Sequence, residues 1–167
     1  QNQACQGSSF GPAVSEATRD LPQASTPEVG IPDLDSGTWT LDVGGAAHRA
    51  LALTIDDLER LPRVSLAVVL ECAGHRRAEF DPPARGIPWG IGAVGEAVWT
   101  GARLRDVLGI AEPQGATHVV LEGADAGRTG ENGHTTAFAR ALPLEKALHD
   151  DTLVTWEMNG APLPAAH

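Results

Sequence analysis

Hydrophobic and polar residues alternate most regularly near residue 40. Residues 39–43 place apolar side chains at every second position, a spacing typical of a strand with one buried face. Two glycines follow at 44–45 and supply a turn. The segment 49–54 then returns to an alternating pattern. The pattern therefore predicts a β-hairpin over residues 39–54.

Three segments have the features of short helices: "TIDDLERLP", "TGARLRDVLGI" and "ALPLEKALHD". Thr54 is the expected N-cap of the first helix, whose acidic residues suit the positive N-terminal end, and Pro62 ends it. The second has apolar residues at helical spacing and is expected to stop at Gly109. Pro143 lies near the first turn of the third.

Further strands are expected on both sides of these helices. "VSLAVVLEC" has apolar residues at both odd and even positions, which predicts a central strand buried on both faces. "THVVLEG" is expected to be another buried strand, and "DTLVTWEM" a third. The Asn159–Gly160 pair is a hairpin signal, yet "APLPAAH" contains no evident partner strand, so we expect a sequence truncated at its C-terminus. Together these elements predict an α+β fold with a mixed β-sheet and short helices.

Length and composition limit the organisation of the chain and its partners. The 167 residues suit one domain, in which residues 1–30 form a disordered or linker-like segment and residues 31–167 carry the order. The formal charge of −10 argues against a nucleic-acid or anionic-membrane partner. No apolar run approaches the roughly 18 residues of a membrane span. A soluble protein is expected, periplasmic or cytoplasmic.

Cys72 lies where a predicted strand passes into a glycine-containing turn. A small buried hydrophobic residue and a reactive or metal-binding thiol are about equally consistent with this position alone. Arg76 and Arg77 favour the second reading, because nearby positive charge stabilises the thiolate. The Cys72–His75 spacing also occurs in zinc sites, but the other histidines do not cluster as further ligands. A disulfide with Cys5 would tie the site to the N-terminal segment.

Three further residues are candidates for a binding site. The adjacent arginines follow a core strand in an acidic protein, and a guanidinium is a natural receptor for an oxyanion. Trp89, after "RGIP", is a candidate wall of such a site. Asp125 ends "HVVLEGAD" before a glycine-rich loop, where a turn-forming aspartate is the common explanation. That loop matches no phosphate-binding pattern, so nucleotide binding has no support.

Four separated motifs occur in the sequence: "LECAGHRR", "GIPWGIGAVGEAVWTGARLRDVL", "VVLEGAD" and "LVTWEMNGAPLPAAH". From about residue 31 onward, their order and spacing resemble those of the sulfite oxidase family of molybdopterin-dependent oxidoreductases. The resemblance implies a sulfite-oxidase-like molybdopterin-binding fold. Residues 31–167 would form the N-terminal part of that domain.

The resemblance also implies roles for five residues. The thiolate of Cys72 would bind molybdenum, and Arg77 would line the pocket for an anionic substrate, so these two are the expected catalytic residues. Asp125 and His167 would contact the pterin, and Trp89 would border the substrate pocket. The implied cofactor is molybdenum–molybdopterin, and no haem-binding segment is visible.

The implied reaction is oxygen-atom transfer to or from a small oxyanion or sulfur compound, with oxidation of sulfite to sulfate as the expected case. An electron acceptor would be a partner, and full-length members of the family form homodimers. The chain departs from the family by reading "TPEVG" where an "RNH"-like segment is usual, and by containing no Tyr. An inactive truncated fragment and a cysteine-dependent thiol enzyme are the alternatives.

Overall fold

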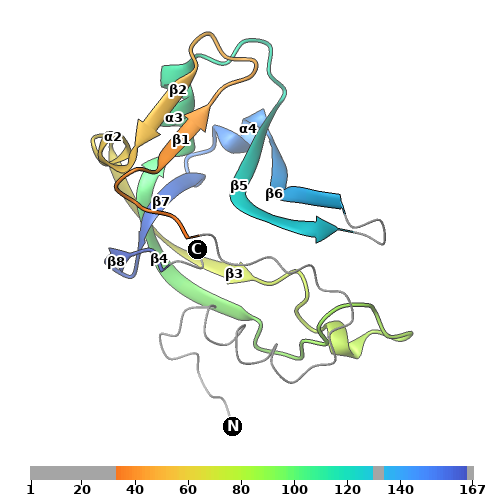
Figure 1. Cartoon of the computed structure of the whole chain (residues 1–167). Coiled ribbons are helices and arrows are strands. Elements are labelled where there is room, and N and C mark those ends of the chain that lie inside the picture. The colour runs from red at the N-terminus through yellow and green to blue at the C-terminus, as the bar shows by residue number, and fades with distance from the viewer. Residues whose placement is uncertain (1–32, 130–133, 165–167) are drawn as a thin grey trace.

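The structure is a computed structural model that describes residues 33–129 and 134–164 (Figure 1). Within these stretches, strands outnumber short helices. The elements, in chain order, are β1 (Thr40–Val43), β2 (Leu51–Thr54), α2 (Ile55–Glu59), β3 (Arg63–Glu71), the 3-10 turn η1 (Arg77–Glu79), β4 (Val94–Arg103), α3 (Leu104–Ala111), β5 (His118–Thr129), β6 (His134–Pro143), α4 (Leu144–Ala147), β7 (Leu153–Met158) and β8 (Ala161–Pro162).

The described strands form three antiparallel sheets. β1 pairs with β2, β5 pairs with β6, and the third sheet has the order β3-β4-β7-β8. In Figure 1 the β5–β6 hairpin stands apart from the long β3–β4 ribbon, which extends away from the helices. The predicted α+β class with short helices is confirmed, and so is the hairpin predicted over residues 39–54.

A small hydrophobic core holds α2 and α3 against the strands. One cluster joins Leu58 of α2 to Val107 of α3 and Trp156 of β7, and Leu58 and Val107 are almost fully buried. A second cluster packs Leu104 and Leu108 of α3 on Ala147 of α4. Both clusters use the apolar stripe that the sequence predicts for α3.

A bulge between β4 and β7 turns Trp156 into this core. The pairing shifts between Thr100, opposite Glu157, and Gly101, opposite Thr155, which leaves Trp156 as the extra residue of β7. Gly101 is buried against the backbone of β7, so a Cβ atom there would meet the carbonyl oxygen of Val154 and lie 2.6 Å from the Cα of Thr155. Only glycine permits this approach of the two strands.

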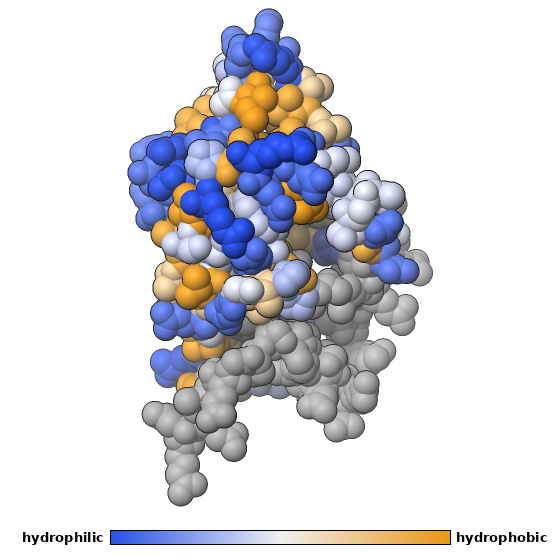
Figure 2. Space-filling model, turned by 90° about the vertical axis from the view of Figure 1, so that its left-hand side faces the viewer, coloured by the Kyte–Doolittle hydropathy of each residue, from blue (hydrophilic) through white to orange (hydrophobic). Residues whose placement is uncertain are grey.

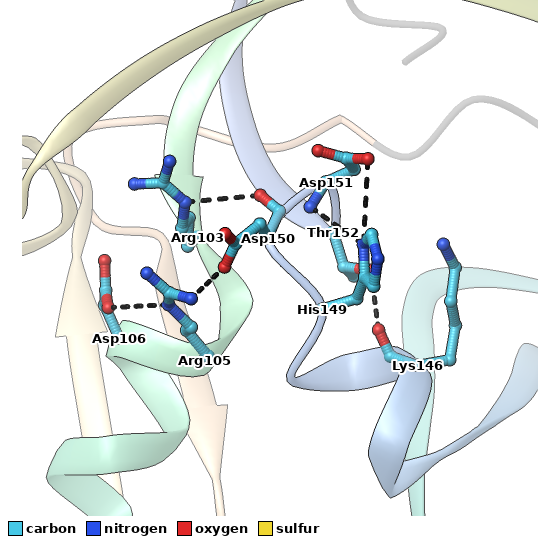
Figure 3. A network of polar contacts seen from close by, with 8 residues as sticks. All are labelled: Arg103, Arg105, Asp106, Lys146, His149, Asp150, Asp151 and Thr152. Carbon is cyan, nitrogen blue, oxygen red and sulfur yellow. Dashed lines mark hydrogen bonds and ion pairs between the residues drawn. The ribbon is translucent and has the colours of Figure 1, made fainter.

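A polar network fastens the start of α3 to the turn between α4 and β7 (Figure 3). The guanidinium of Arg103 donates to the carbonyl of Asp150 at 3.2 Å, and Arg105 binds the carboxylate of the same residue. Thr152 donates its hydroxyl to the carbonyl of Lys146 at 2.7 Å. These contacts lie on the surface, so they fix the geometry of the junction more than they stabilise the fold.

Several expectations about burial are wrong. β3 is an edge strand of its sheet with alternating burial, whereas its sequence predicts a central strand. The side chain of Val69 is 62% exposed and that of Val120, in β5, is 65% exposed. Apolar side chains therefore lie on both faces of these strands, and on the second face no described residue covers them.

Element boundaries also differ from the prediction. Residues 100–103 of the second predicted helical segment belong to β4, and α3 begins at Leu104. α3 continues past Gly109 to Ala111, because glycine lowers helix propensity without preventing a helix. A partner strand does follow the Asn159–Gly160 turn: β8 pairs with Glu157 and Met158 of β7. Its two residues are too few to produce a recognisable alternating pattern.

The surface of the described residues mixes apolar and polar groups. Figure 2, a view from the left-hand side of Figure 1, shows hydrophobic residues interspersed with hydrophilic ones on that face. Within residues 33–129 and 134–164, no helix is both long enough and apolar enough to cross a bilayer.

The N-terminus of α2 provides a test of the fold. Thr54 accepts a hydrogen bond from the amide of Asp57 and the Asp57 carboxylate binds back, which completes the predicted cap. The hydroxyl and the amide of Thr54 both donate to the carboxylate of Asp57, at 2.7 and 3.1 Å, and lower the pKa of Asp57 below its ordinary value of 3.8, with help from Arg60. We expect Thr54→Ala to lower the free energy of unfolding by about 1 kcal/mol in urea denaturation at pH 7.

The pH dependence follows from the direction of this shift. A carboxyl with a lowered folded-state pKa stabilises the fold above its ordinary pKa, and the contribution disappears as the pH falls through the lowered value. The difference between Thr54→Ala and the parent chain should therefore shrink below pH 3.8. An unchanged difference down to pH 2 would contradict this account. Thr135→Ala, on an exposed position of β6, is the control.

Candidate functional site

Cys72 is the first residue after β3, in a tight loop that ends in η1. Its amide donates to the carbonyl of Ala93 at 2.9 Å, and its own carbonyl accepts from the amide of His75 at 2.8 Å. The thiol is free and half-buried, and its Sγ accepts from the amide of Gly74 at 3.4 Å. These hydrogen bonds fix the position of the sulfur at the end of β3.

A second segment runs beside this loop and carries Trp89. Backbone hydrogen bonds of 3.0 Å join Arg76 to the carbonyl of Gly90 and Ala78 to the carbonyl of Trp89. Trp89 is half-buried, and its ring lies against Gly74, since a Cβ on that glycine would be 2.8 Å from the Trp89 Cδ1. The structure thus places Trp89 next to the Cys72 loop, and its role as a wall of a substrate pocket stays a prediction.

The two adjacent arginines have different surroundings. Arg76 is exposed and pairs with the carboxylate of Glu79, Nε to Oε2 at 2.8 Å. This hydrogen bond lowers the pKa of Glu79 and raises the pKa of Arg76. Arg77 is half-buried, donates from Nη1 to the carbonyl of Ile87 at 3.2 Å, and has no carboxylate within ion-pair distance among the described residues. Of the two adjacent arginines, Arg77 is therefore the one whose charge is available to an external anion.

His75 adds a buried polar atom to the same loop. Its side chain is 16% exposed, and its Nε2 lies 3.9 Å from Oε1 of Glu71. Its Nδ1 is buried and makes no hydrogen bond within the described part of the chain. A buried polar atom without a partner is uncommon and marks a place where a polar ligand would be accommodated.

Asp125 and His167 are the two remaining candidates. Asp125 lies inside β5 at the bulge between Glu122 and Ala126, and its carboxylate lies close over Gly123. It is thus a strand residue, and not the end of a strand as its sequence context suggests. No described hydrogen bond or ion pair connects it to the Cys72 loop. His167 lies outside the described residues, so its expected cofactor contact stays a prediction.

The structure brings Cys72, Arg77 and Trp89 together and adds residues that sequence reasoning missed. Gly74 and Gly86 both lie against the guanidinium of Arg77, and Ile87 supplies the carbonyl that binds it. The only sequence signal for them is the pair of glycines in "CAGH" and "RGIP". Nothing in a single sequence reveals that both face one side chain.

Comparison with known proteins identifies the family. Residues 28–167 match the family model of the oxidoreductase molybdopterin binding domain. Mitochondrial sulfite oxidase of Homo sapiens is 41% identical over 145 residues, which are 82% of this chain and 26% of that protein. Nitrate reductase [NADH] 1 of Oryza sativa subsp. japonica is 39% identical over 145 residues, 82% of this chain and 16% of that protein.

A solved structure supports the fold. The sulfane dehydrogenase SoxCD from Paracoccus pantotrophus matches with a TM-score of 0.66 and 23% identity, over 81% of this chain and 33% of that chain. The present chain spans about a quarter of the length of the human sulfite oxidase that it matches. The match to the family model covers most of the chain, so the chain belongs to the family of oxidoreductases with a molybdopterin-binding domain.

Proposed function

We propose that this chain binds the molybdenum–molybdopterin cofactor through the thiolate of Cys72 and serves oxygen-atom transfer on a small oxyanion. The observation that carries the proposal is the free, half-buried thiol of Cys72 in one loop with Arg77, whose charge has no carboxylate partner among the described residues. Sulfite is the proposed substrate, since the human relative is a sulfite oxidase. Nitrate is the second candidate, because another relative is a nitrate reductase.

The side chains near Cys72 suit a metal whose other ligands belong to the cofactor. Nowhere in the described stretches do three His, Cys, Asp or Glu side chains gather as a metal site. A single soft thiolate suits a transition metal whose other ligands come from a dithiolene, and it would not hold zinc alone. The buried Nδ1 of His75, beside the Cys72 loop, is available to a polar ligand. These features agree with the cofactor that the family implies.

Each residue of the site has a proposed task. When bound, the cofactor supplies the redox chemistry, in which sulfite and water give sulfate, two protons and two electrons that pass to an acceptor. Cys72 would hold the metal at the end of β3. Arg77 would orient the oxyanion and offset the negative field of a chain with a formal charge of −10. Trp89 would restrict water at one wall of the pocket.

The experiment that tests the proposal is metal and pterin analysis of the chain after expression in a host that makes the molybdenum cofactor. Close to one molybdenum and one pterin per chain, with sulfite-dependent reduction of an artificial one-electron acceptor, would support it. Nitrate-dependent oxidation of a reduced dye would instead support the second substrate. A soluble, folded chain that retains neither molybdenum nor pterin would contradict the proposal.

The two arginines provide a matched pair of variants. Arg77→Met should raise the KM for sulfite tenfold to a hundredfold, because charge-assisted hydrogen bonds are worth about 1.5–3 kcal/mol. Arg76→Met removes the same charge from an exposed position that pairs with Glu79, so KM should change less than about twofold. Steady-state kinetics at fixed ionic strength would check both values. Equal effects of the two changes would show that only net charge matters.

A further inference from the structure

We infer that Gly74 and Gly86 are positioning residues, which fix the guanidinium of Arg77 by leaving space only for that group. The oxyanion-binding task of Arg77 rests on the proposed function, whereas the placement of its side chain is independent of it. Both glycines belong to loops that hydrogen bonds hold together, one following β3 and the other preceding β4.

Gly86 contacts the outer side of the guanidinium. A Cβ atom at this position would lie 2.5 Å from Nη1 of Arg77 and 3.1 Å from its Cζ. To reach ordinary van der Waals contact, Nη1 would have to retreat by roughly 1 Å. That movement would break its 3.2 Å hydrogen bond to the carbonyl of Ile87, the residue next to Gly86.

Gly74 contacts the same group from the Cys72 loop. A Cβ there would lie 2.9 Å from Nη2 of Arg77 and 2.8 Å from Cδ1 of Trp89. Gly74 is buried, so the intruding atom could not be turned out to solvent. The guanidinium therefore lies against both glycines, and the ring of Trp89 lies beside Gly74.

This arrangement holds Arg77 without neutralising it. An ion pair, such as that of Arg76 with Glu79, would order the side chain but would use its charge. Arg77 is ordered instead by close contact with two glycines and by one neutral carbonyl. The conformational entropy of a long side chain is thus lost before an anion arrives, which is the usual gain from a preorganised receptor.

The test uses the Nε–Hε signal of Arg77 in the ¹H–¹⁵N spectrum of the full chain, assigned by its loss in Arg77→Met. In the parent chain, the heteronuclear NOE of this signal should be high, as for an ordered Nε–Hε group. In Gly86→Ala it should become mobile. Gly92→Ala is the matched control, because Gly92 has nearly the same positive φ, +105° against +110°, yet no atom lies within 4 Å of its added Cβ. Backbone strain is thus present in both variants and the clash in only one.

A second variant separates the clash from strain altogether. Gly74 does not have a positive φ, and the three atoms nearest to its added Cβ belong to Arg77 and Trp89, so Gly74→Ala disturbs these contacts without adding backbone strain. The Arg77 signal should again lose order while the backbone amide signals stay dispersed. An Arg77 signal as ordered in both alanine variants as in the parent chain would overturn the inference. So would an equal loss of order in Gly92→Ala.

Inorganic sulfate then links this placement to anion binding. In the parent chain, sulfate should shift the Arg77 signal, and Gly86→Ala should weaken sulfate binding by roughly tenfold or more. In the Arg77→Met background the same glycine change should have no further effect on sulfate binding measured by calorimetry. If sulfate leaves an ordered Arg77 signal unmoved in the parent chain, the positioning role stands and the proposed oxyanion role of Arg77 fails.

Discussion

Cys72→Ser should lower the molybdenum content of the purified chain by roughly tenfold or more, since even residues that only support metal ligands cost 10–100-fold in metal affinity. Serine has nearly the shape of cysteine, so the loop and its hydrogen bonds to Ala93 and His75 should persist. Its hydroxyl is a hard ligand that does not ionise near neutral pH, and it cannot replace a soft thiolate. Molybdenum would be measured by mass spectrometry of the desalted protein and pterin by fluorescence after oxidation.

The control is Ala73→Ser, which adds the same hydroxyl to the next residue and leaves the thiol in place. Ala73 is exposed, so this change should leave both molybdenum content and stability unaltered. If Cys72→Ser kept its full molybdenum content, the metal would be held without the thiol and the proposed ligand would be wrong. A parallel loss in Ala73→Ser would point to damage of the loop instead.

Gly101→Ala should reduce the free energy of unfolding by about 3 kcal/mol, the upper part of the range for overpacking a buried site. The added Cβ would meet backbone atoms of β7, the carbonyl of Val154 and the Cα of Thr155, and no side chain can move to make room. Strands β4 and β7 would have to separate at the bulge that directs Trp156 into the core. Urea denaturation followed by far-UV circular dichroism would measure the stability of both proteins.

Gly109→Ala is the matched control for this prediction. Gly109 lies in α3, is exposed, and has no atom within 4 Å of an added Cβ. Alanine has the higher helix propensity, so this change should stabilise the chain by up to about 1 kcal/mol. Opposite signs for the two glycine changes are expected. Equal stability of Gly101→Ala and the parent chain would mean that the strands do not approach as closely as described.

Local features of the fold could be predicted from the sequence because neighbouring residues determine them. The first hairpin follows from its alternating pattern and paired glycines, and α2 follows from the cap at Thr54 and the stop at Pro62. Each signal is contained within a few residues. The same holds for α4, whose Pro143 is the N-cap residue in the structure.

Burial and pairing could not be predicted so well, because they depend on residues far away in the chain. β3 and β5 have apolar residues at both odd and even positions, which predicts burial of both faces of each strand. Within the described structure only one face of each strand is covered. β4 and β6 were not predicted at all. β4 lies partly in a glycine-rich stretch, and its register against β3 pairs residues such as Arg63 and Ala102, which are remote in sequence.

In the candidate site, too, some features could be predicted from the sequence and others required the structure. Residue chemistry and position predict Cys72, Trp89 and the pair Arg76 and Arg77 as candidates, and the structure places Arg77 and Trp89 around the Cys72 loop. The distinction between Arg76 and Arg77 needed coordinates, because only these show which guanidinium pairs with a carboxylate. The resemblance to the family had singled out Arg77, whereas composition and spacing treated the two alike.

The β3–β4 ribbon has a consequence for the energetics of ligand binding. β7 pairs with residues 99–103 of β4, and Asn159 adds two hydrogen bonds to Val98. The outer part of that strand, Val94–Ala97, therefore has β3 as its one strand partner within the described residues. Two-stranded ribbons are marginally stable, and such segments open locally at a lower free energy than the whole fold. The Cys72 loop sits at the end of this ribbon. A ligand that binds the closed form there suppresses local opening in proportion to its occupancy, so the stability of the ribbon reports how fully its site is filled.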